Sequence, residues 1–407
     1  MQPLRRFLAF AGPGYLVAVG YMDPGNWATA LSGGSTFGYS LLSVILLSSV
    51  MAMFLQAAAV RLGIAGNTDL ASACRLYLGR RTSLFLWVVC ELAIVACNVA
   101  EVLGMACGLQ LLLHIPLIWG VCLTTLDVLL VLQLQNRGAR YLEALIIGLT
   151  ALIGACMALQ LWWLKPSAAL FSGFLPDPTI VAQPEMLYVA IAIMGATVMP
   201  HNLYLHSSIV RSHANYGSIR SAIRYATLDS NIALTLALLV NASILILAAG
   251  AFHAPGRGPV TELADAYHLL SPLLGVGAAS AVFGLGLVAS GLTSSITGTL
   301  AGQIVMEGFL DMRVSRAQRA LWGRLLAIVP SIAVALAVGE SGIGKALVFT
   351  QVVLGLQLPF AIVPLLWFTT RSRFLGVYAF GTGAAIALWS VAALVIAGNG
   401  WMLLRLI

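Results

Sequence analysis

The sequence predicts an all-α membrane protein with eleven transmembrane helices, and three observations carry that prediction. Of the 407 residues, 60% are hydrophobic and 9% are charged, whereas a soluble domain carries roughly a quarter charged residues. Apolar runs of about 20 residues recur along the chain, and each can cross about 30 Å of hydrocarbon. The basic residues also alternate between the two sides that this pattern of runs defines.

The apolar runs are interpreted as helices because a membrane-spanning segment must satisfy its own backbone hydrogen bonds. A barrel would need short strands of alternating polarity, which the sequence lacks. The eleven predicted helices lie near residues 8–32, 39–62, 83–113, 117–134, 143–164, 187–210, 230–252, 273–305, 322–339, 346–368 and 376–402.

The net charge of +7 reports topology rather than a nucleic-acid partner. If the first side of the predicted bundle is cytoplasmic, only Lys165, Arg257, Lys345 and Arg405 of the 21 basic residues lie on the other side. This is a strong positive-inside bias, and one missed helix would scramble it. We therefore expect a multi-pass protein of the cell (inner) membrane, with a cytoplasmic N-terminus and a C-terminus outside.

No cleavable signal is evident, because the first apolar run is too long for a signal core and lacks a cleavage pattern. Five of the six cysteines fall within predicted helices, so a disulfide framework is not expected. No linker or low-complexity tract divides the chain. We expect residues 1–407 to form one transmembrane domain that functions as a monomer.

Two predicted helices contain interruptions at matching places. The first contains the run from Gly20 to Asn26, with Pro24, and the sixth contains the run from Gly195 to Asn202, with Pro200. They begin two groups of five helices, near 8–164 and 187–368, with an eleventh helix near 376–402. Broken helices at matching places indicate an inverted repeat with a binding site near the membrane midplane.

Each proline frees a backbone acceptor. Pro24 and Pro200 cannot donate a hydrogen bond and clash with the carbonyls four residues earlier, those of Gly20 and Ala196. A free acceptor in hydrocarbon is costly unless something pairs with it. A cation or cavity water would do so, which places an available carbonyl beside the polar residues of each break.

The side chains at the two breaks resemble a metal-ligand set. Asp23 offers a carboxylate, Asn26 an amide oxygen, Ala196 a carbonyl and Met199 a thioether. Oxygen donors alone would suit Mg²⁺ or Ca²⁺, but a thioether favours softer transition metals. Ordinary core packing is the alternative for Met199. A carboxylate in mid-membrane is functional by default, and a structural acceptor role is the alternative for Asp23.

A second polar stripe lies on the third helix, where Glu91, Asn98 and Glu101 fall on one face. It indicates either a proton path or a packed polar seam between helices. His201 and His206 follow the break in the sixth helix. They could pass protons near neutral pH or simply bond to neighbouring helices.

Two further features are less informative alone. Gly298 and Gly302 form a small-xxx-small pair in the eighth helix, which is typical of close helix packing. Gln351 is a polar residue near the start of the tenth helix.

These motifs together resemble a known family. The run Asp23-Pro24-Gly25-Asn26, followed by Met199-Pro200-His201, is similar to the signature pair of the natural resistance-associated macrophage protein (Nramp) family. The similarity extends essentially from end to end. It includes Leu205-His206-Ser207-Ser208 and Gly298-Thr299-Leu300-Ala301-Gly302-Gln303.

The resemblance implies a LeuT-like fold of five plus five helices, with helices 1 and 6 broken. It also implies import of Mn²⁺ or Fe²⁺ as the transported substrate, usually together with protons. No cofactor is implied. Asp23, Asn26, Met199 and the carbonyl of Ala196 match the family's metal ligands, and Gln351 matches a glutamine that joins them. A further set matches residues tied to proton movement: Glu101, His201 and His206.

Two departures from the family pattern concern the proton route. Asn98 stands where the family commonly has an aspartate, and Gly323-Arg324 stands where it commonly has two arginines. We therefore expect an acidic–basic pair of the family to be missing here. The resulting hypothesis is metal transport with altered or looser proton coupling, with Glu91, Asn98 and Arg324 along the affected route.

Other functions remain as alternatives. A Mg²⁺ or amino-acid carrier could use the same scaffold, although Met199 argues against Mg²⁺ and Asp23 would repel a substrate carboxylate. A metal uniporter or channel-like leak would differ in lacking saturable, coupled uptake. An intramembrane enzyme is the least favoured, because no nucleophile–base or paired-aspartate motif is evident.

Overall fold

The computed structural model describes residues 12–127, 133, 139–213, 218–254, 256, 258–312 and 316–406. Throughout these residues the secondary structure is helical and no strand occurs, as the sequence predicts. Nine helices of this part are long and apolar enough to cross a membrane. They correspond to nine of the predicted spans.

Seven of these spans are single helices with intact interiors, and an eighth, α19, closes the chain. Their bounds are α4 (Leu42–Ala65), α6 (Arg80–Leu113), α9 (Ala139–Leu164), α13 (Ile219–Phe252), α15 (Ala279–Leu310), α16 (Arg316–Val338), α17 (Ile343–Thr369) and α19 (Thr382–Leu406). The ninth is a broken span made of α11 (Pro184–Val198) and α12 (Pro200–Ile209).

The two remaining predicted spans have a different form. The first is broken into α2 (Pro13–Gly20) and α3 (Pro24–Phe37), so neither piece is long enough to be counted as a span by itself. The fourth begins with α7 (Leu117–Leu123), and its apolar helix is described to Asp127. Most of residues 128–134 of that prediction lies outside the described residues, so the count of eleven stays a prediction.

Several short helices connect the spans, and the sequence pattern did not predict them. Helices were predicted from apolar runs long enough to span a membrane, and these segments are too short to contain such a run. They are α5 (Leu70–Tyr77), η1 (Ala168–Phe174), α10 (Thr179–Ala182), η2 (Val210–His213), α14 (Leu263–Leu274), η3 (Glu340–Gly342), α18 (Ser372–Leu375) and η4 (Gly376–Tyr378).

The α14 connector is tied to the start of α17 through Glu262. One carboxylate oxygen of Glu262 accepts a hydrogen bond from the backbone N–H of Gly344, at 2.6 Å. Burial raises the pKa of Glu262, and the hydrogen bonds from the backbone of Gly344 and Lys345 oppose that rise. The contact therefore fastens the loop between α13 and α15 onto the first turn of α17.

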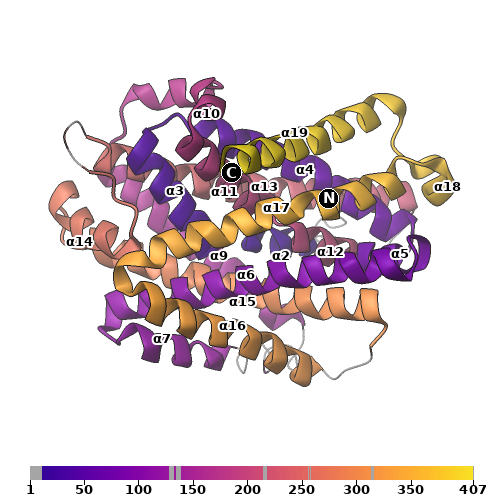
Figure 1. Cartoon of the computed structure of the whole chain (residues 1–407), viewed down its shortest axis with the longest axis horizontal. Helices are drawn as coiled ribbons and strands as arrows, with labels where there is room; N and C mark the ends of the chain where they lie inside the picture. Colours follow the sequence, from indigo (N-terminus) through magenta and orange to yellow (C-terminus); the bar gives the residue numbers. More distant parts are fainter. Residues whose placement is uncertain are drawn as a thin grey trace, which may run out of the picture.

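The long helices run roughly along one axis of the molecule. Figure 1 shows α6 and α17 side by side across the bundle, with α15 and α16 below and α19 above. Behind them, α13 packs against α2, α3 and α4. The two broken helices therefore lie within a shell formed by α4, α6, α13, α15 and α17.

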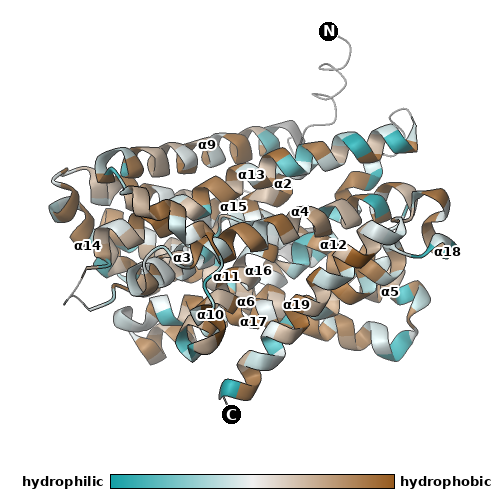
Figure 2. Cartoon of the chain, turned by 90° about the horizontal axis from the view of Figure 1, so that it is seen from above, coloured by the Kyte–Doolittle hydropathy of each residue, from teal (hydrophilic) through white to brown (hydrophobic). Residues whose placement is uncertain are grey.

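The outer surface is apolar, as a lipid-facing surface requires. Figure 2 shows brown, hydrophobic stretches along the long helices, with teal residues more frequent near helix ends and connectors. Trp162 and Leu336 are about three-quarters and two-thirds exposed, at 76% and 67%. Exposed side chains of this kind along several long helices are expected where the solvent is hydrocarbon rather than water.

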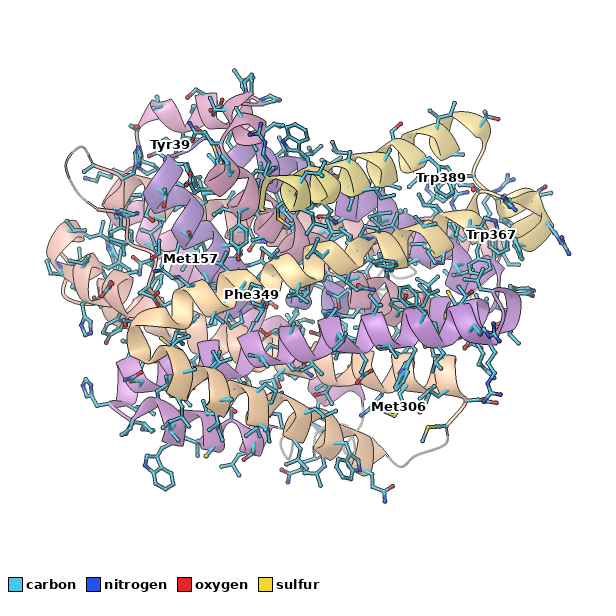
Figure 3. The ribbon with its side chains drawn as sticks, in the orientation of Figure 1. Tyr39, Met157, Met306, Phe349, Trp367 and Trp389 are labelled. Carbon is cyan, nitrogen blue, oxygen red and sulfur yellow. The ribbon has the colours of Figure 1, made fainter. Side chains whose placement is uncertain are left out.

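An aromatic cluster lies at the far end of α17. Trp367 contacts Phe374 with ring centroids 5.0 Å apart, and the guanidinium of Arg371 lies 4.9 Å from the Trp367 ring. In Figure 3, Trp367 lies near one end of the bundle, whereas Phe349 lies nearer the middle on the same helix. Rings combined with a basic group at a helix end are typical of the membrane–water interface.

Candidate functional site

The break in the first span is held open by Asp23. This residue has extended backbone geometry, and its Oδ1 accepts a hydrogen bond from the backbone N–H of Asn26 at 2.8 Å. Asp23 therefore caps the N-terminus of α3, and Pro24 occupies the first helical position, where no N–H is needed. The same sequence features that end α2 thus begin α3.

Side chains of other helices satisfy the unwound backbone between α2 and α3. Asn241 of α13 donates from Nδ2 to the carbonyl of Tyr21 at 2.8 Å. Ser290 of α15 donates its hydroxyl to the carbonyl of Met22. Irregular backbone at membrane depth persists only where the surrounding protein supplies such partners.

A direct hydrogen bond joins the two breaks. Asn26 donates from Nδ2 to the carbonyl of Ala196 at 3.0 Å, across 170 residues of sequence. Ala196 lies two residues before the end of α11, and Met199 links α11 to α12 ahead of Pro200. The sequence predicted a free carbonyl at Ala196, and the structure places a polar side chain of the other break on it.

Gln351 of α17 lies between the breaks because two glycines leave room for it. A Cβ on Gly25 would fall 1.9 Å from Nε2 of Gln351 and 2.9 Å from Oδ2 of Asp23. A Cβ on Gly195 would fall 2.1 Å from the carbonyl oxygen of Gln351. The chain can therefore bring Gln351 beside Asp23 only with glycine at both positions.

The resulting cluster contains buried oxygen atoms that accept no hydrogen bond. Asp23, Met199 and Gln351 are fully buried. Oδ2 of Asp23 and Oε1 of Gln351 have no hydrogen-bond partner, and Asp23 makes no ion pair, within the described residues. A buried carboxylate without a counter-charge is costly. A cation bound between Asp23, Gln351, Ala196 and Met199 would remove that cost.

The donor set combines hard and soft atoms. Carboxylate, amide and carbonyl oxygens suit Mn²⁺, and the thioether of Met199 adds a soft donor. Sδ of Met199 accepts from Nδ2 of Asn202 at 3.6 Å, a weak contact that a metal ion could replace. Among the described residues no three His, Cys, Asp or Glu side chains are grouped to hold a metal, so the site lacks the ligand set of a structural zinc centre.

The predicted proton residues do not form one continuous chain. Glu101 is buried on α6, and its Oε1 lies 3.7 Å from Sγ of Cys97. Sγ of Cys97 is in turn 3.9 Å from Nε2 of His201 on α12. Glu101 and His201 are thus connected through a cysteine, Cys97, that no motif in the sequence distinguishes.

His206 belongs to a different group. Its Nδ1 lies 2.8 Å from Oε1 of Gln56 on α4, and Gln56 donates from Nε2 to the hydroxyl of Tyr21. His206 is therefore linked to the first break, through a path separate from Cys97. Bonding to neighbouring helices, the alternative left open for the histidines, accounts for this contact.

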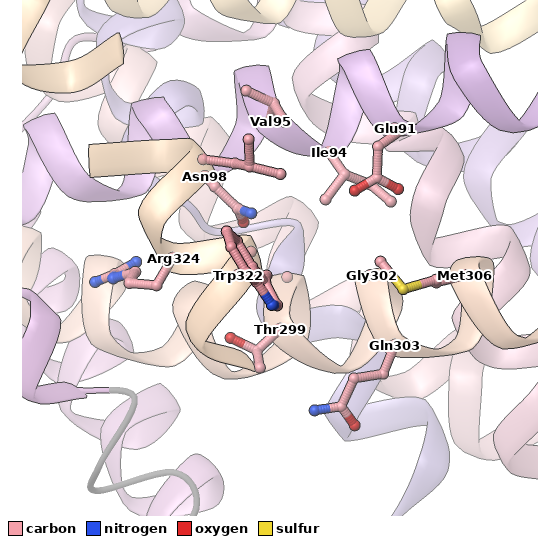
Figure 4. A pocket seen from close by; sticks show the side chains of 13 residues that line it. Glu91, Ile94, Val95, Asn98, Thr299, Gly302, Gln303, Met306, Trp322 and Arg324 are labelled. Atoms are coloured by element: carbon pink, nitrogen blue, oxygen red, sulfur yellow. The ribbon is translucent and has the colours of Figure 1, made fainter. Parts of the chain in front are cut away.

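Glu91 and Asn98 lie along a groove between α6, α15 and α16. The groove is also lined by Gln303, Trp322 and Arg324, and Figure 4 shows these side chains bordering the same space. Glu101, although on the same helix, does not line it. The polar stripe predicted on the third helix therefore divides, with two members at the groove and one directed inward.

Gly298 brings the two parts of that stripe close together. A Cβ at this position would lie 2.7 Å from Oδ1 of Asn98 and 3.0 Å from Oε1 of Glu101. The sequence pattern predicts that Gly298 serves close packing between helices. The helices do approach closely there, but the atoms that need the space are polar.

The predicted loss of the family's acidic–basic pair concerns Asn98 and Gly323, and the structure shows a different acidic–basic pair nearby. Arg324, which is 5% exposed, forms an ion pair with Asp127 on the fourth span. Arg324 also donates to the carbonyl of Thr124 at 2.7 Å, and Ser295 donates to Asp127 at 2.7 Å. Asn98 cannot supply the charge, but a carboxylate from another helix does, and only the three-dimensional structure brings it there.

We predict that Gly25→Ala lowers the affinity for Mn²⁺ by roughly tenfold or more, because its methyl group would displace Gln351 from the cluster. Equilibrium Mn²⁺ binding to purified protein measures this. Gly154→Ala on α9 is the matched control, since nothing lies within 4 Å of its Cβ position. Equal affinity in Gly25→Ala and wild type would exclude Gln351 as a ligand.

We also predict that Asp127→Asn destabilises the protein by about 3–5 kcal/mol, because it leaves Arg324 buried without its counter-charge. The double variant Asp127→Asn, Arg324→Gln should recover a large part of that loss. Thermal denaturation of the three proteins in one detergent provides the comparison. If Asp127→Asn were as stable as wild type, the ion pair between Asp127 and Arg324 would not contribute to the stability of the protein.

Comparisons with known proteins agree with this geometry. A family model described as natural resistance-associated macrophage protein-like (Nramp) matches residues 14–405. The divalent metal cation transporter MntH of Nostoc sp. is 53% identical over 405 residues, which cover 98% of this chain and 92% of that protein. These relatives are named as transporters, in agreement with the expectation that the chain is not an enzyme.

Solved structures extend the similarity to the fold. The crystal structure of a manganese transporter from Eremococcus coleocola matches with a TM-score of 0.87 and 37% identity, covering 97% of this chain and 85% of that one. MHP1, a nucleobase-cation-symport-1 family transporter, matches with a TM-score of 0.62 and 14% identity, over 97% and 91% of the two chains. The second match shows the LeuT-like fold alone. On its sequence match, its paired helix breaks and its fold, this chain belongs to the Nramp family.

Proposed function

We propose that this protein is a secondary active transporter that imports divalent transition metal ions, Mn²⁺ and Fe²⁺, into the cytoplasm by alternating access. The observation that carries the proposal is the hydrogen bond from Asn26 to the carbonyl of Ala196, which joins the two breaks beside the unpaired Oδ2 of Asp23. Gln351 packs against Gly25 and Gly195 at the same place. Two kinds of relative support the proposal. Several are named divalent metal cation transporter, and a similar solved structure is the manganese transporter of Eremococcus coleocola.

The metal ligands in this proposal are Asp23, Asn26, Met199, Gln351 and the carbonyl of Ala196. Asn26 now donates from its amide nitrogen to Asp23 and Ala196. Rotation of that amide by half a turn would present its oxygen instead, since an amide carries a donor and an acceptor on opposite sides. Binding would then replace two internal hydrogen bonds with metal contacts.

Broken helices fit alternating access rather than a permanent pore. The ligands are fully or almost fully buried, so release to either side requires a movement of the surrounding helices. Half-helices that end at the site can reorient with their own ligands attached. Residues 1–407 act in this proposal as one monomeric transporter domain in the cell inner membrane, with the N-terminus inside, the C-terminus outside and no cofactor.

Proton linkage is the finer part of the proposal. Glu101, His201 and His206 are the candidates nearest the breaks, and Glu91, Asn98 and Arg324 lie toward the groove. Because Asn98 has no titratable group and Arg324 is already paired with Asp127, the groove holds fewer free charges than a route with an aspartate at position 98. We propose that coupling is looser as a result.

We predict saturable Mn²⁺ uptake into proteoliposomes that resists excess Mg²⁺ and Ca²⁺. Asp23→Ala should abolish uptake, because the only carboxylate among the proposed ligands is removed. Met199→Ala should keep uptake but lose resistance to Ca²⁺, because the soft donor is gone. Met402→Ala is the control, since Met402 is also buried but lies on α19. Current that rises linearly with Mn²⁺ would instead indicate a channel, and uptake blocked by Mg²⁺ would indicate a Mg²⁺ carrier.

We further predict that Asn98→Asp raises the number of protons carried per Mn²⁺ ion. The new carboxylate would face the groove beside Arg324 and offer a titratable group where the wild type has none. A pH-sensitive dye inside proteoliposomes, read together with radiolabelled Mn²⁺, gives the ratio. A wild-type ratio equal to that of an Nramp protein with aspartate at this position would contradict the proposed loose coupling.

A further inference from the structure

Four exposed arginines gather at the end of the bundle where α17 ends. Arg80 and Arg81 begin α6, and Arg371 and Arg373 lie at the start of α18, just after α17. Figure 1 shows α5, which leads into α6, and α18 at the same end of the molecule. The two pairs come from distant parts of the sequence, so the fold brings them together.

An aromatic cluster joins the two arginine pairs. The ring centroid of Tyr77, at the end of α5, lies 5.1 Å from that of Phe374 and 5.8 Å from that of Phe368. Arg373 directly precedes Phe374, and Arg80 follows Tyr77 by three residues. Both pairs are therefore attached to one packed aromatic cluster, and their side chains extend from it into solvent.

None of the four arginines forms an ion pair within the described residues. Asp311, at the same end of the bundle, already pairs with Arg75 of α5 at 3.1 Å. Asp69 pairs with Arg211 at 3.3 Å. The first turns of α6 and α18 contain no acidic side chain. Like charges gathered in one place repel one another, and an anion bound among them removes that cost.

Beside the arginines, the seam between α6 and α17 carries exposed apolar side chains. The ring centroids of Phe85 and Phe360 lie 5.5 Å apart across this seam, and the two residues are 51% and 38% exposed. Leu84 on α6 and Val363 on α17 are also exposed. Phe85 follows Arg80 by five residues, which is about 7.5 Å along a helix. A ligand that contacts both the arginines and the seam needs an anionic end and an apolar end.

We propose that this end of the bundle binds an anionic phospholipid. Its phosphate groups lie between the two arginine pairs, and its acyl chains follow the seam between α6 and α17. A guanidinium binds phosphate oxygens through paired N–H donors, and basic clusters at helix ends suit the anionic headgroups of the inner leaflet. A free phosphate ion would satisfy the arginines but would leave the apolar seam without a partner.

A bound lipid at this place connects the ends of two long helices. The helix α6 carries Glu101, and α17 carries Gln351, so the lipid would hold together two helices that line the two breaks. Lipid binding is measured without metal, and its result therefore does not depend on the proposed function.

The experiment titrates cardiolipin, which carries two phosphates, or phosphatidylcholine, which has no net charge, into purified protein in detergent and counts bound lipid by native mass spectrometry. Each basic group near an anionic headgroup contributes about fivefold in affinity. The double variant Arg80→Gln, Arg81→Gln should therefore bind cardiolipin about 25-fold more weakly than wild type, and Arg373→Gln about fivefold more weakly. The affinity for phosphatidylcholine should not change. The matched control is Arg220→Gln, Arg224→Gln, which removes the same charge from two exposed arginines of α13.

The charge-conserving variant Arg80→Lys, Arg81→Lys should keep most of the affinity for cardiolipin, which separates loss of binding from loss of folding. Equal affinity for cardiolipin in the glutamine double variant and in wild type would overturn the proposal. An equal loss in the control pair would also overturn it, because net charge rather than this site would then set the affinity. Displacement of bound cardiolipin by millimolar inorganic phosphate would show that the arginines bind a free anion instead of a lipid.

Discussion

The hydrogen bond from Asn26 to the carbonyl of Ala196 is the contact on which the arrangement of the site depends. It fastens the break of the first span to the break of the sixth. Each break exists because a proline removes a donor and redirects the chain. Without a partner, each would leave polar backbone in a low-dielectric interior. This hydrogen bond between the two breaks satisfies the carbonyl of Ala196, while Oδ2 of Asp23 has no hydrogen-bond partner among the described residues.

The local part of this site could be read from the sequence. A proline, its preceding residue and an N-capping carboxylate act within a few positions of one another. The end of α2 and the start of α3, and the end of α11 and the start of α12, therefore follow from short-range rules. Long apolar runs likewise gave the positions of the described long spans. The resemblance to a family, rather than any local rule, pointed to Gln351.

The remaining features depend on contacts across the sequence that local patterns do not contain. Gly25 and Gly195 resemble helix glycines until the side chain and backbone of Gln351 are seen against them. Asp127 sits in an ordinary apolar run, and its significance appears only when Arg324 approaches from another helix. Cys97 lies in a long apolar run of the sequence, and only the structure shows that its Sγ is near both Glu101 and His201.

The partners of the unwound segment between α2 and α3 have a consequence for how it can change shape. Its carbonyls at Tyr21 and Met22 are held by an amide on α13 and a hydroxyl on α15, not by a helical ladder in which each bond depends on its neighbours. Side-chain donors can release and re-form one at a time through rotamer changes. The segment can therefore change its backbone angles by breaking one side-chain hydrogen bond at a time. The ease of that change depends on Asn241 of α13 and Ser290 of α15, which lie outside the segment.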